Sequence, residues 1–270
     1  MTDATGRTDA QQGQVSEDES RKVAEGAREA EWGGATFMRD LFLGDFRLDL
    51  LHPYPDPDDY ISDRARAYID ELRTFLREEV DADRIDREGK IPRRVIDRLR
   101  EMGAFGLKIS EEYDGMGFNQ SEYEAIMSVV GSFDGNLVAL LSAHQSIGVP
   151  QPLKLFGDEA QKREYLPRVA KGEISAFALT EPQVGSDPAG LESSVERTED
   201  GDFVLNGEKL WITNVTVADI IVVMARHADT GRISAFIVET DWEGVEISHR
   251  LDFMGLKALE NGIVRFDDVR

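Results

Sequence analysis

The hydrophobic positions between residues 58 and 172 recur at intervals of three and four residues, with charged side chains between them. The first apolar stripe consists of Ile61, Ala65, Tyr68, Leu72, Phe75, Leu76 and Val80. A second stripe begins after Pro92 and ends at Gly103, residues typical of a helix start and stop. This periodicity indicates amphipathic helices, so residues 58–172 are predicted to form an all-helical N-terminal domain.

Three more helices are predicted in the same region. Asn119 can cap a helix that carries Tyr123 and Ile126 on its apolar face. The run LVALLSAHQSIG is apolar nearly all round, which favours a helix buried in the bundle. The last helix, DEAQKREYLPRVAKGE, begins at the cap residue Asp158 and has Lys171 near its end, as the helix dipole favours.

After Gly172 the pattern changes to short alternating runs that are rich in β-branched and aromatic residues. These runs are ISAFALT, SSVERT, DFVLNGEKLWIT, ADIIVVMARH, RISAFIVET, GVEISHR and GIVRFDDV. Residues 173–270 are therefore predicted to form a β-barrel or sandwich domain. Within it, Asn206-Gly207 predicts a tight hairpin turn, since both residues tolerate positive φ. The fold class is thus α+β and multidomain.

The N-terminal residues differ from both domains. Residues 1–31 contain no Leu, Ile or Phe and are predicted to form a disordered acidic tail. Residues 32–57 are apolar but interrupted by Gly and Pro, which predicts an extended or irregular segment. The chain has no signal-like apolar run at its start and no run of about 20 apolar residues, so a cytoplasmic protein without a membrane span is expected.

The net charge of −22 disfavours nucleic acid and anionic lipid as partners, because both require clustered Lys and Arg. The absence of Cys and the presence of only four His residues leave no basis for a disulfide framework, a thiolate metal site or a His-rich metal cluster. The most informative polar residues are those that follow apolar runs.

Two stretches end apolar runs in hydrogen-bonding residues: FALTEPQVGSD, residues 177–187, and KLWITN, residues 209–214. Taken separately, the first is most often only a turn and the second only a strand with a cross-strand aromatic. His144 is interpreted as a hydrogen-bonded core residue rather than a base. The segment Asp114–Gly117 is only superficially like a phosphate loop, because no strand precedes it and it lacks the phosphate-binding lysine.

Five stretches together, in this order, resemble the acyl-CoA dehydrogenase family. They are SAHQSIG, LFGDEAQKREYLPRVAKGE, AFALTEPQVGSD, LNGEKLWITN and FMGLKALENGIVRFDDVR. SAHQSIG and the early ATFMRDLFLGDF are most similar to the very-long-chain branch and its bacterial relatives. The resemblance implies FAD as cofactor, a helical N-terminal domain, a β middle domain and a C-terminal helical bundle.

The resemblance also implies roles for residues at the two strand ends. Donors are needed at the flavin edge, where negative charge builds up when the ring accepts a hydride. The residues implied to bind FAD are Phe177, Ala178, Leu179, Thr180, Gly185, Ser186, Trp211, Ile212 and Thr213. Ser186 is also implied to contact the CoA portion of the substrate, because Gly185 lets backbone N–H groups approach a phosphate.

The family reaction converts a fatty acyl-CoA to a trans-2-enoyl-CoA, and its base is a Glu that usually lies in the C-terminal bundle. That bundle is absent from these 270 residues, so no acid is assigned as the base. A fragment, or a chain that needs a partner, is expected, and the chain alone is expected to be inactive. Electron-transferring flavoprotein is the implied oxidant, and a homo-oligomer is expected. An acyl-CoA oxidase and a non-catalytic remnant or interaction protein remain as alternatives.

Overall fold

The computed structural model describes residues 36–54, 56 and 59–270, and the predicted tail of residues 1–31 lies outside this range. The chain divides into two compact units, Met1–Asp59 and Tyr60–Arg270. In the first unit, where no regular element is predicted, a short helix α2 spans Phe37–Phe42 and a 3-10 turn η2 spans Leu48–Leu50. All further elements belong to the second unit.

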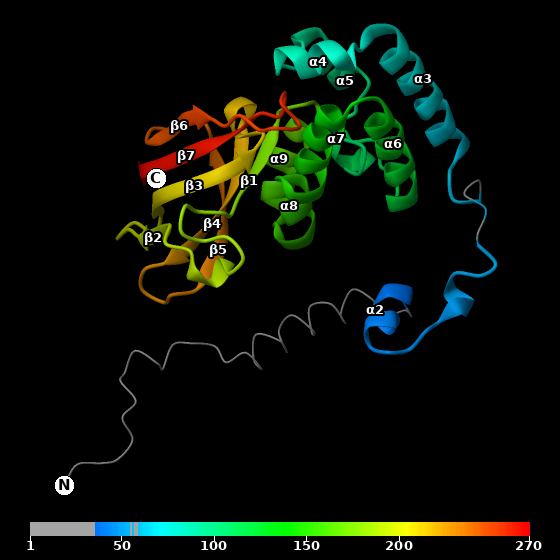
Figure 1. The fold of residues 1–270 in the computed structure, drawn as a ribbon. Coiled ribbons are helices and arrows are strands. Elements are labelled where there is room, and N and C mark those ends of the chain that lie inside the picture. Colours follow the sequence, from blue (N-terminus) through cyan, green and yellow to red (C-terminus); the bar gives the residue numbers. More distant parts are fainter. Residues whose placement is uncertain (1–35, 55, 57–58) are drawn as a thin grey trace. The chain divides into compact units, whose positions relative to one another are not determined.

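The second unit begins with helices and ends with strands (Figure 1). The helices are α3 (Asp63–Glu79), α4 (Ala82–Glu88), α5 (Arg93–Glu101), α6 (Gln120–Phe133), α7 (Gly135–Ser142), α8 (Pro150–Phe156) and α9 (Glu159–Ala170). Short turns η4 (Glu111–Tyr113) and η5 (Ala143–Ile147) lie between them. Among the described residues, none of the helices combines the length and the apolar character needed to cross a bilayer.

Side-chain caps explain where most of these helices begin. The side chains of Ser62, Asp81, Asn119, Asp134 and Asp158 each accept a hydrogen bond from a backbone N–H of the first helical turn. Asn119 and Asp158 also form complete capping boxes. The predicted starts at Asn119 and Asp158 are confirmed.

The run LVALLSAHQSIG forms helix α7 and continues into η5, which is one turn of π-helix. His144 lies on this turn and is fully buried. The backbone N–H of Ser175 donates to its Nδ1 at 3.0 Å, and its Nε2 lies 3.1 Å from the carbonyl oxygen of Phe105. Since the backbone N–H can only donate, Nε2 carries the proton. The prediction that His144 is a hydrogen-bonded core residue is confirmed.

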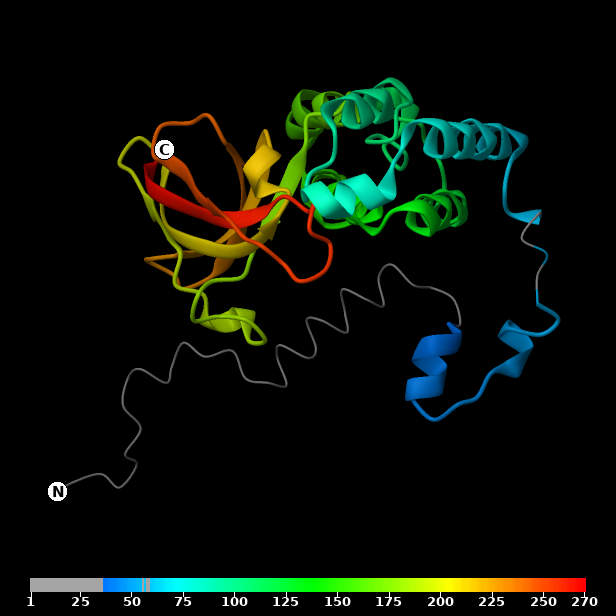
Figure 2. The ribbon, with the colours of Figure 1, turned by 45° about the horizontal axis from the view of Figure 1, so that its top comes forward.

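The seven predicted β runs form a seven-stranded mixed sheet. The strands are β1 (Ser175–Ala178), β2 (Ser194–Arg197), β3 (Phe203–Thr213), β4 (Ile220–His227), β5 (Ile233–Glu239), β6 (Val245–Arg250) and β7 (Asn261–Val269). Their order is β1-β4-β2-β3-β7-β6, and β5 pairs with the other edge of β4. Figure 2 shows the strands curving around a common interior. The predicted α+β fold class, helices first and a compact β part second, is confirmed.

The predicted hairpin at Asn206-Gly207 is wrong. Both residues lie inside the continuous strand β3, at a register shift against β7. A Cβ on Gly207 would lie 2.3 Å from the Oγ of Ser193 and 2.8 Å from its Cα. The glycine therefore serves close approach of the segment before β2, not a turn, and its positive φ of 148° is part of that irregularity.

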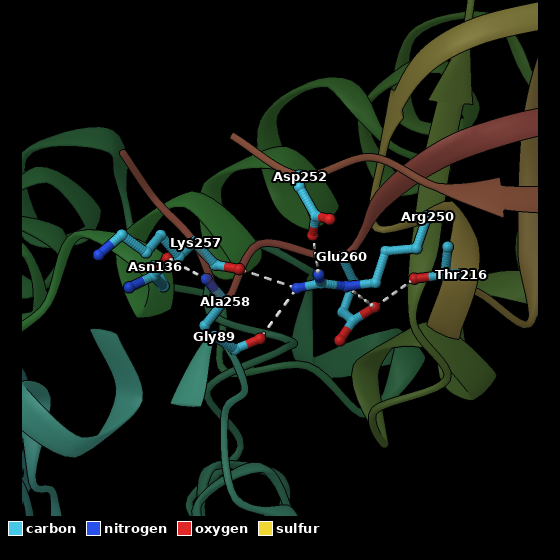
Figure 3. Close-up of polar contacts among 8 residues, drawn as sticks. All are labelled: Gly89, Asn136, Thr216, Arg250, Asp252, Lys257, Ala258 and Glu260. Carbon is cyan, nitrogen blue, oxygen red and sulfur yellow. Dashed lines mark hydrogen bonds and ion pairs between the residues drawn. The ribbon is translucent and has the colours of Figure 1, made fainter. Parts of the chain in front are cut away.

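Arg250, at the end of β6, connects the sheet to the helical part (Figure 3). Its Nη2 donates to the carbonyl oxygens of Gly89, after α4, and Lys257, at 3.0 and 2.8 Å. Its Nε donates to Glu260 at 3.1 Å and its Nη1 to Asp252 at 3.2 Å. One guanidinium thus holds the segment between β6 and β7 against the turn that follows α4.

Candidate functional site

The two polar stretches predicted to carry the site meet in space. The backbone N–H of Leu210 donates to the carbonyl oxygen of Thr180 at 2.9 Å, so the chain after β1 runs beside β3. The Nδ2 of Asn214 reaches the carbonyl oxygen of Ser175 at 3.4 Å, which fixes the other end of the same contact. Thr213 lies three residues beyond Leu210, roughly 10 Å along the strand at about 3.3 Å per residue. Thr180 and Thr213 therefore lie along one line of contact between the two stretches, which we call the strand-end edge, with Thr180 near one end and Thr213 near the other.

Trp211 projects from this edge. The register of β3 against β7 shifts between Lys209 and Ile212. Trp211 lies within this irregularity and has a left-handed φ of 59°. Its side chain is 59% exposed, although the residues on both sides are buried or half-buried. A bulge that turns one side chain out of a sheet is a common device at functional sites. Here it leaves Trp211 exposed between Leu210, which contacts Thr180, and Thr213.

Asn261, the first residue of β7, determines how the hydroxyl of Thr213 can be used. Its Nδ2 donates to the Oγ1 of Thr213 and to the carbonyl oxygen of Trp211, both at 3.2 Å. Because the Thr213 oxygen already accepts a hydrogen bond, its own O–H is left to donate to another group. The arrangement is suited to an acceptor that gains negative charge.

Asn214 fixes the turn after β3 to helix α7. It is fully buried, has a left-handed φ of 71°, and donates through Nδ2 to the carbonyl oxygen of Leu140 at 3.1 Å. The Oδ1 atoms of Asn214 and Asn261 are both buried without a hydrogen-bond partner. Two orphaned acceptors next to an exposed edge are unusual, since buried polar atoms are nearly always paired.

A buried ion pair holds the loop that follows Thr180. The Nζ of Lys209 lies 2.6 Å from Glu181 Oε1 and donates to the carbonyl oxygen of Leu179 at 3.2 Å. The Glu181 carboxylate also accepts from the backbone N–H groups of Glu192 and Ser193, at 2.6 and 3.0 Å. The Glu181 side chain is 4% exposed and the Lys209 side chain 0%, so the buried pair closes the loop at its base.

The environment favours the ionised form of Glu181. Burial alone would raise the pKa of its carboxyl, but the bond from Lys209 and the backbone donors outweigh burial and leave the pKa below its ordinary value. Burial lowers the pKa of the Lys209 ammonium, and Glu181 offsets only part of that effect. A pair of this kind is stable only while both members are present.

The nine residues implied to bind FAD divide into three groups. Thr180, Trp211 and Thr213 have side chains at the edge. Gly185 and Ser186 are exposed in the loop closed by Glu181, and a Cβ on Gly185 would meet no atom within 4 Å.

The other four offer little from their side chains. Ala178 and Ile212 are buried in the core of the sheet, so only their backbone groups can face a ligand. Phe177 packs instead against the apolar cluster formed with α8 and α9. The carbonyl oxygen of Leu179 is already bonded to Lys209.

Sequence reasoning missed Glu181, Lys209 and Asn261. Glu181 and Lys209 lie 28 positions apart, and no pattern in the sequence links them. Asn261 stands where the sequence predicts a strand to begin, and nothing in that pattern indicates a contact with β3. The only signal available was that Glu181 directly follows Thr180 and Lys209 shortly precedes Thr213.

Two acids near this edge, within the part of the chain that the structure describes, already have partners. Glu181 is paired with Lys209, and Glu260 is bonded to Arg250 and to the hydroxyl of Thr216. His144 is neutral, because burial lowers its pKa to about 4. The chemistry that these described residues offer is therefore orientation and hydrogen-bond donation.

The order of parts, helices followed by a mixed sheet with a polar strand-end edge, defines a class of fold shared with solved acyl-CoA dehydrogenases. One such enzyme, from Bacillus anthracis and complexed with FAD, superposes with a TM-score of 0.71 at 32% identity over 78% of this chain and 37% of that chain. Two family profiles also match, the N-terminal domain over residues 62–173 and the middle domain over residues 176–269 of acyl-CoA dehydrogenases.

The chain belongs to the acyl-CoA dehydrogenase family. It is 48% identical over 266 residues to the probable acyl-CoA dehydrogenase FadE10 of Mycobacterium tuberculosis, covering 97% of this chain and 41% of that protein. It is 36% identical over 249 residues to the mitochondrial very long-chain specific acyl-CoA dehydrogenase of Bos taurus, covering 87% of this chain and 37% of that protein. The chain thus spans less than half the length of these relatives.

Proposed function

We propose that this chain supplies the flavin edge and part of the acyl-CoA surface of an FAD-dependent enzyme that oxidises fatty acyl-CoA to trans-2-enoyl-CoA. The observation that carries the proposal is the contact of Thr180 with Leu210 in β3, because Trp211 and Thr213 follow on the same strand and Asn261 bonds to the hydroxyl of Thr213. When bound, FAD would supply the hydride acceptor for this reaction. Electron-transferring flavoprotein is proposed as the partner that takes the electrons onward.

The residues at the edge fit the needs of a flavin ring. The hydroxyl of Thr213, held by Asn261, can donate to a ring atom at which negative charge develops. Trp211 offers an exposed aromatic face for packing beside the ring. The Oδ1 atoms of Asn214 and Asn261, in the same region, have no hydrogen-bond partner. Unpaired buried acceptors support the proposal that a polar ligand binds here.

The loop from Glu181 to Ser193 supports a phosphate-bearing part of the cofactor or substrate. Gly185 and Ser186 are exposed at its tip, while Glu181 and Lys209 hold its base. A loop fixed at its base keeps its backbone N–H groups in place, which lowers the entropic cost of binding an anion. The acid that removes the α proton is not assigned to any residue described here.

Replacing Thr213 by Val tests the proposal in the FAD-loaded enzyme. The variant keeps the shape of the side chain and removes the donor, so we expect anaerobic flavin reduction by a long-chain acyl-CoA to slow about tenfold or more, the value of one hydrogen bond to a charged group. The reduction is followed as bleaching of the visible flavin absorption.

The matched control is Thr74→Val, on the surface of α3, where the hydroxyl bonds only to the carbonyl oxygen of Asp70. The control should behave as the wild type. Equal FAD affinity and equal reduction rates in Thr213→Val and Thr74→Val would contradict the placement of the flavin at this edge. Rapid consumption of dioxygen by the reduced enzyme would assign it to the oxidases instead.

A further inference from the structure

A second concave site lies in the helical part. It is a cleft of about 320 Å³ between the segment that precedes η4, the π-turn η5 and the helices α8 and α9. Lys108, Lys154 and Lys162 line it, together with Gln145, Tyr113 and Phe118. None of these residues belongs to the edge formed by β1 and β3.

The charge of this cleft is opposite to that of the chain, whose net charge is −22. Among the ion pairs of the described residues, neither Lys108 nor Lys154 has a carboxylate within 4.0 Å, whereas Lys162 pairs with Glu159 at 3.3 Å. The nearby Glu124 acts on Lys108 from a distance, but its carboxylate accepts a hydrogen bond from Gln120. Neither lysine thus has a carboxylate in ion-pair contact, and Glu124 acts on Lys108 only from a greater distance.

Lys108 and Lys154 are also close enough to repel each other. Burial and the charge of Lys154 lower the pKa of the Lys108 ammonium. The Nζ of Lys108 lies 4.4 Å from the ring centroid of Tyr123, an aromatic contact that holds the ammonium in a fixed place. A bound anion would relieve the repulsion between the two lysines, since it attracts both.

Gln145 adds an independent sign of a ligand. It is 2% exposed, lines the same cleft, and donates through Nε2 to the carbonyl oxygen of Ala104 at 3.0 Å. Its Oε1 is buried and has no hydrogen-bond partner. A buried acceptor without a donor destabilises the fold. Because Oε1 is closed to solvent, a ligand with a hydroxyl or N–H group would remove that destabilisation only when the Gln145 side chain turns towards the cleft.

We infer that this cleft binds a small phosphorylated molecule that also carries a hydroxyl group. Lys108 and Lys154 hold the phosphate, and the Oε1 of Gln145 accepts from the hydroxyl after the side chain turns towards the cleft. Such a phosphate has two sources, a free phosphate ester or the nucleotide end of coenzyme A. The inference does not depend on the proposed function, because it uses no residue of the strand-end edge.

Calorimetric titration of the whole chain at low ionic strength tests this site with inorganic phosphate, glycerol 3-phosphate and coenzyme A. We expect saturable binding, with glycerol 3-phosphate bound more tightly than phosphate because of its hydroxyl groups. The double substitution Lys108→Gln/Lys154→Gln should weaken binding at least tenfold. The matched control is Lys171→Gln, which removes one positive charge from an exposed lysine that pairs with Asp114 outside the cleft.

The single variant Lys154→Gln removes an exposed side chain and keeps the test valid should the double variant fold poorly. Tighter binding of coenzyme A than of glycerol 3-phosphate would assign the cleft to nucleotide phosphates, and the reverse order to a free phosphate ester. Absence of saturable binding for all three probes, or equal binding by Lys154→Gln and Lys171→Gln, would overturn the inference.

Discussion

Replacing Lys209 by Met is expected to lower the free energy of unfolding by about 3–5 kcal/mol, because it leaves the Glu181 carboxylate buried without its counter-charge. Urea unfolding followed by circular dichroism measures the change. Since Glu181 closes the loop that leads to Ser193, the same variant should be cut more rapidly by proteases within that loop.

Two further variants show whether the effect comes from the unpaired charge. Lys257→Met removes a half-exposed lysine that pairs with Asp86 at 3.0 Å, and it should cost no more than about 1 kcal/mol. The double variant Glu181→Gln/Lys209→Met removes both charges and should regain much of the lost stability. If Lys209→Met proves as stable as Lys257→Met, the pair does not hold the loop as described.

Stability should also fall as the pH is lowered from 6.5 towards 4, through His144. Burial lowers the pKa of its imidazole in the folded chain to about 4, against 6.5 as its ordinary value. In this window the unfolded chain binds a proton that the folded chain excludes, so acid favours unfolding. The contribution of the neutral ring is complete above pH 6.5, and about 3 kcal/mol of it is lost by pH 4.

The measurement is the slope of unfolding free energy against pH, compared between the wild type and His144→Gln. The variant is less stable at pH 7, because two hydrogen bonds of the ring are altered, but its slope between pH 6.5 and 4.5 should be shallower. Thr74→Val changes no titratable group and should retain the wild-type slope. Parallel slopes for wild type and His144→Gln would show that His144 titrates normally.

The helices and strands could be predicted because their signals are local. Asn119 and Asp158 cap their helices by bonding to residues three positions away, and period-two runs became strands. The hairpin at Asn206-Gly207 failed for the opposite reason. Gly207 is required by Ser193, a residue that approaches it only in the folded chain. A local turn signal cannot be told from a glycine that serves a distant neighbour.

The candidate site shows the same difference between what local sequence predicts and what long-range contacts determine. Thr180, Trp211 and Thr213 came from a family resemblance, and the structure places their stretches side by side. The groups that support them were not predicted, because each acts across the sheet: Lys209 on Glu181, and Asn261 on Thr213. The sequence does not show whether a lysine such as Lys209 is buried or solvated, because that depends on tertiary contacts.

The contacts of Arg250 have a mechanical consequence. Its guanidinium is bonded at once to the turn after α4, to the segment before β7 and to Glu260. A hinge motion that separated helices from sheet would have to break the bond from Arg250 to Gly89, together with the bonds from Lys257 to Asp86 and from the backbone N–H of Ala258 to Asn136, each at 3.0 Å. We therefore expect the helices and the sheet of the second compact unit to move as one rigid body. Large ligands would then enter and leave through motion of parts outside this unit.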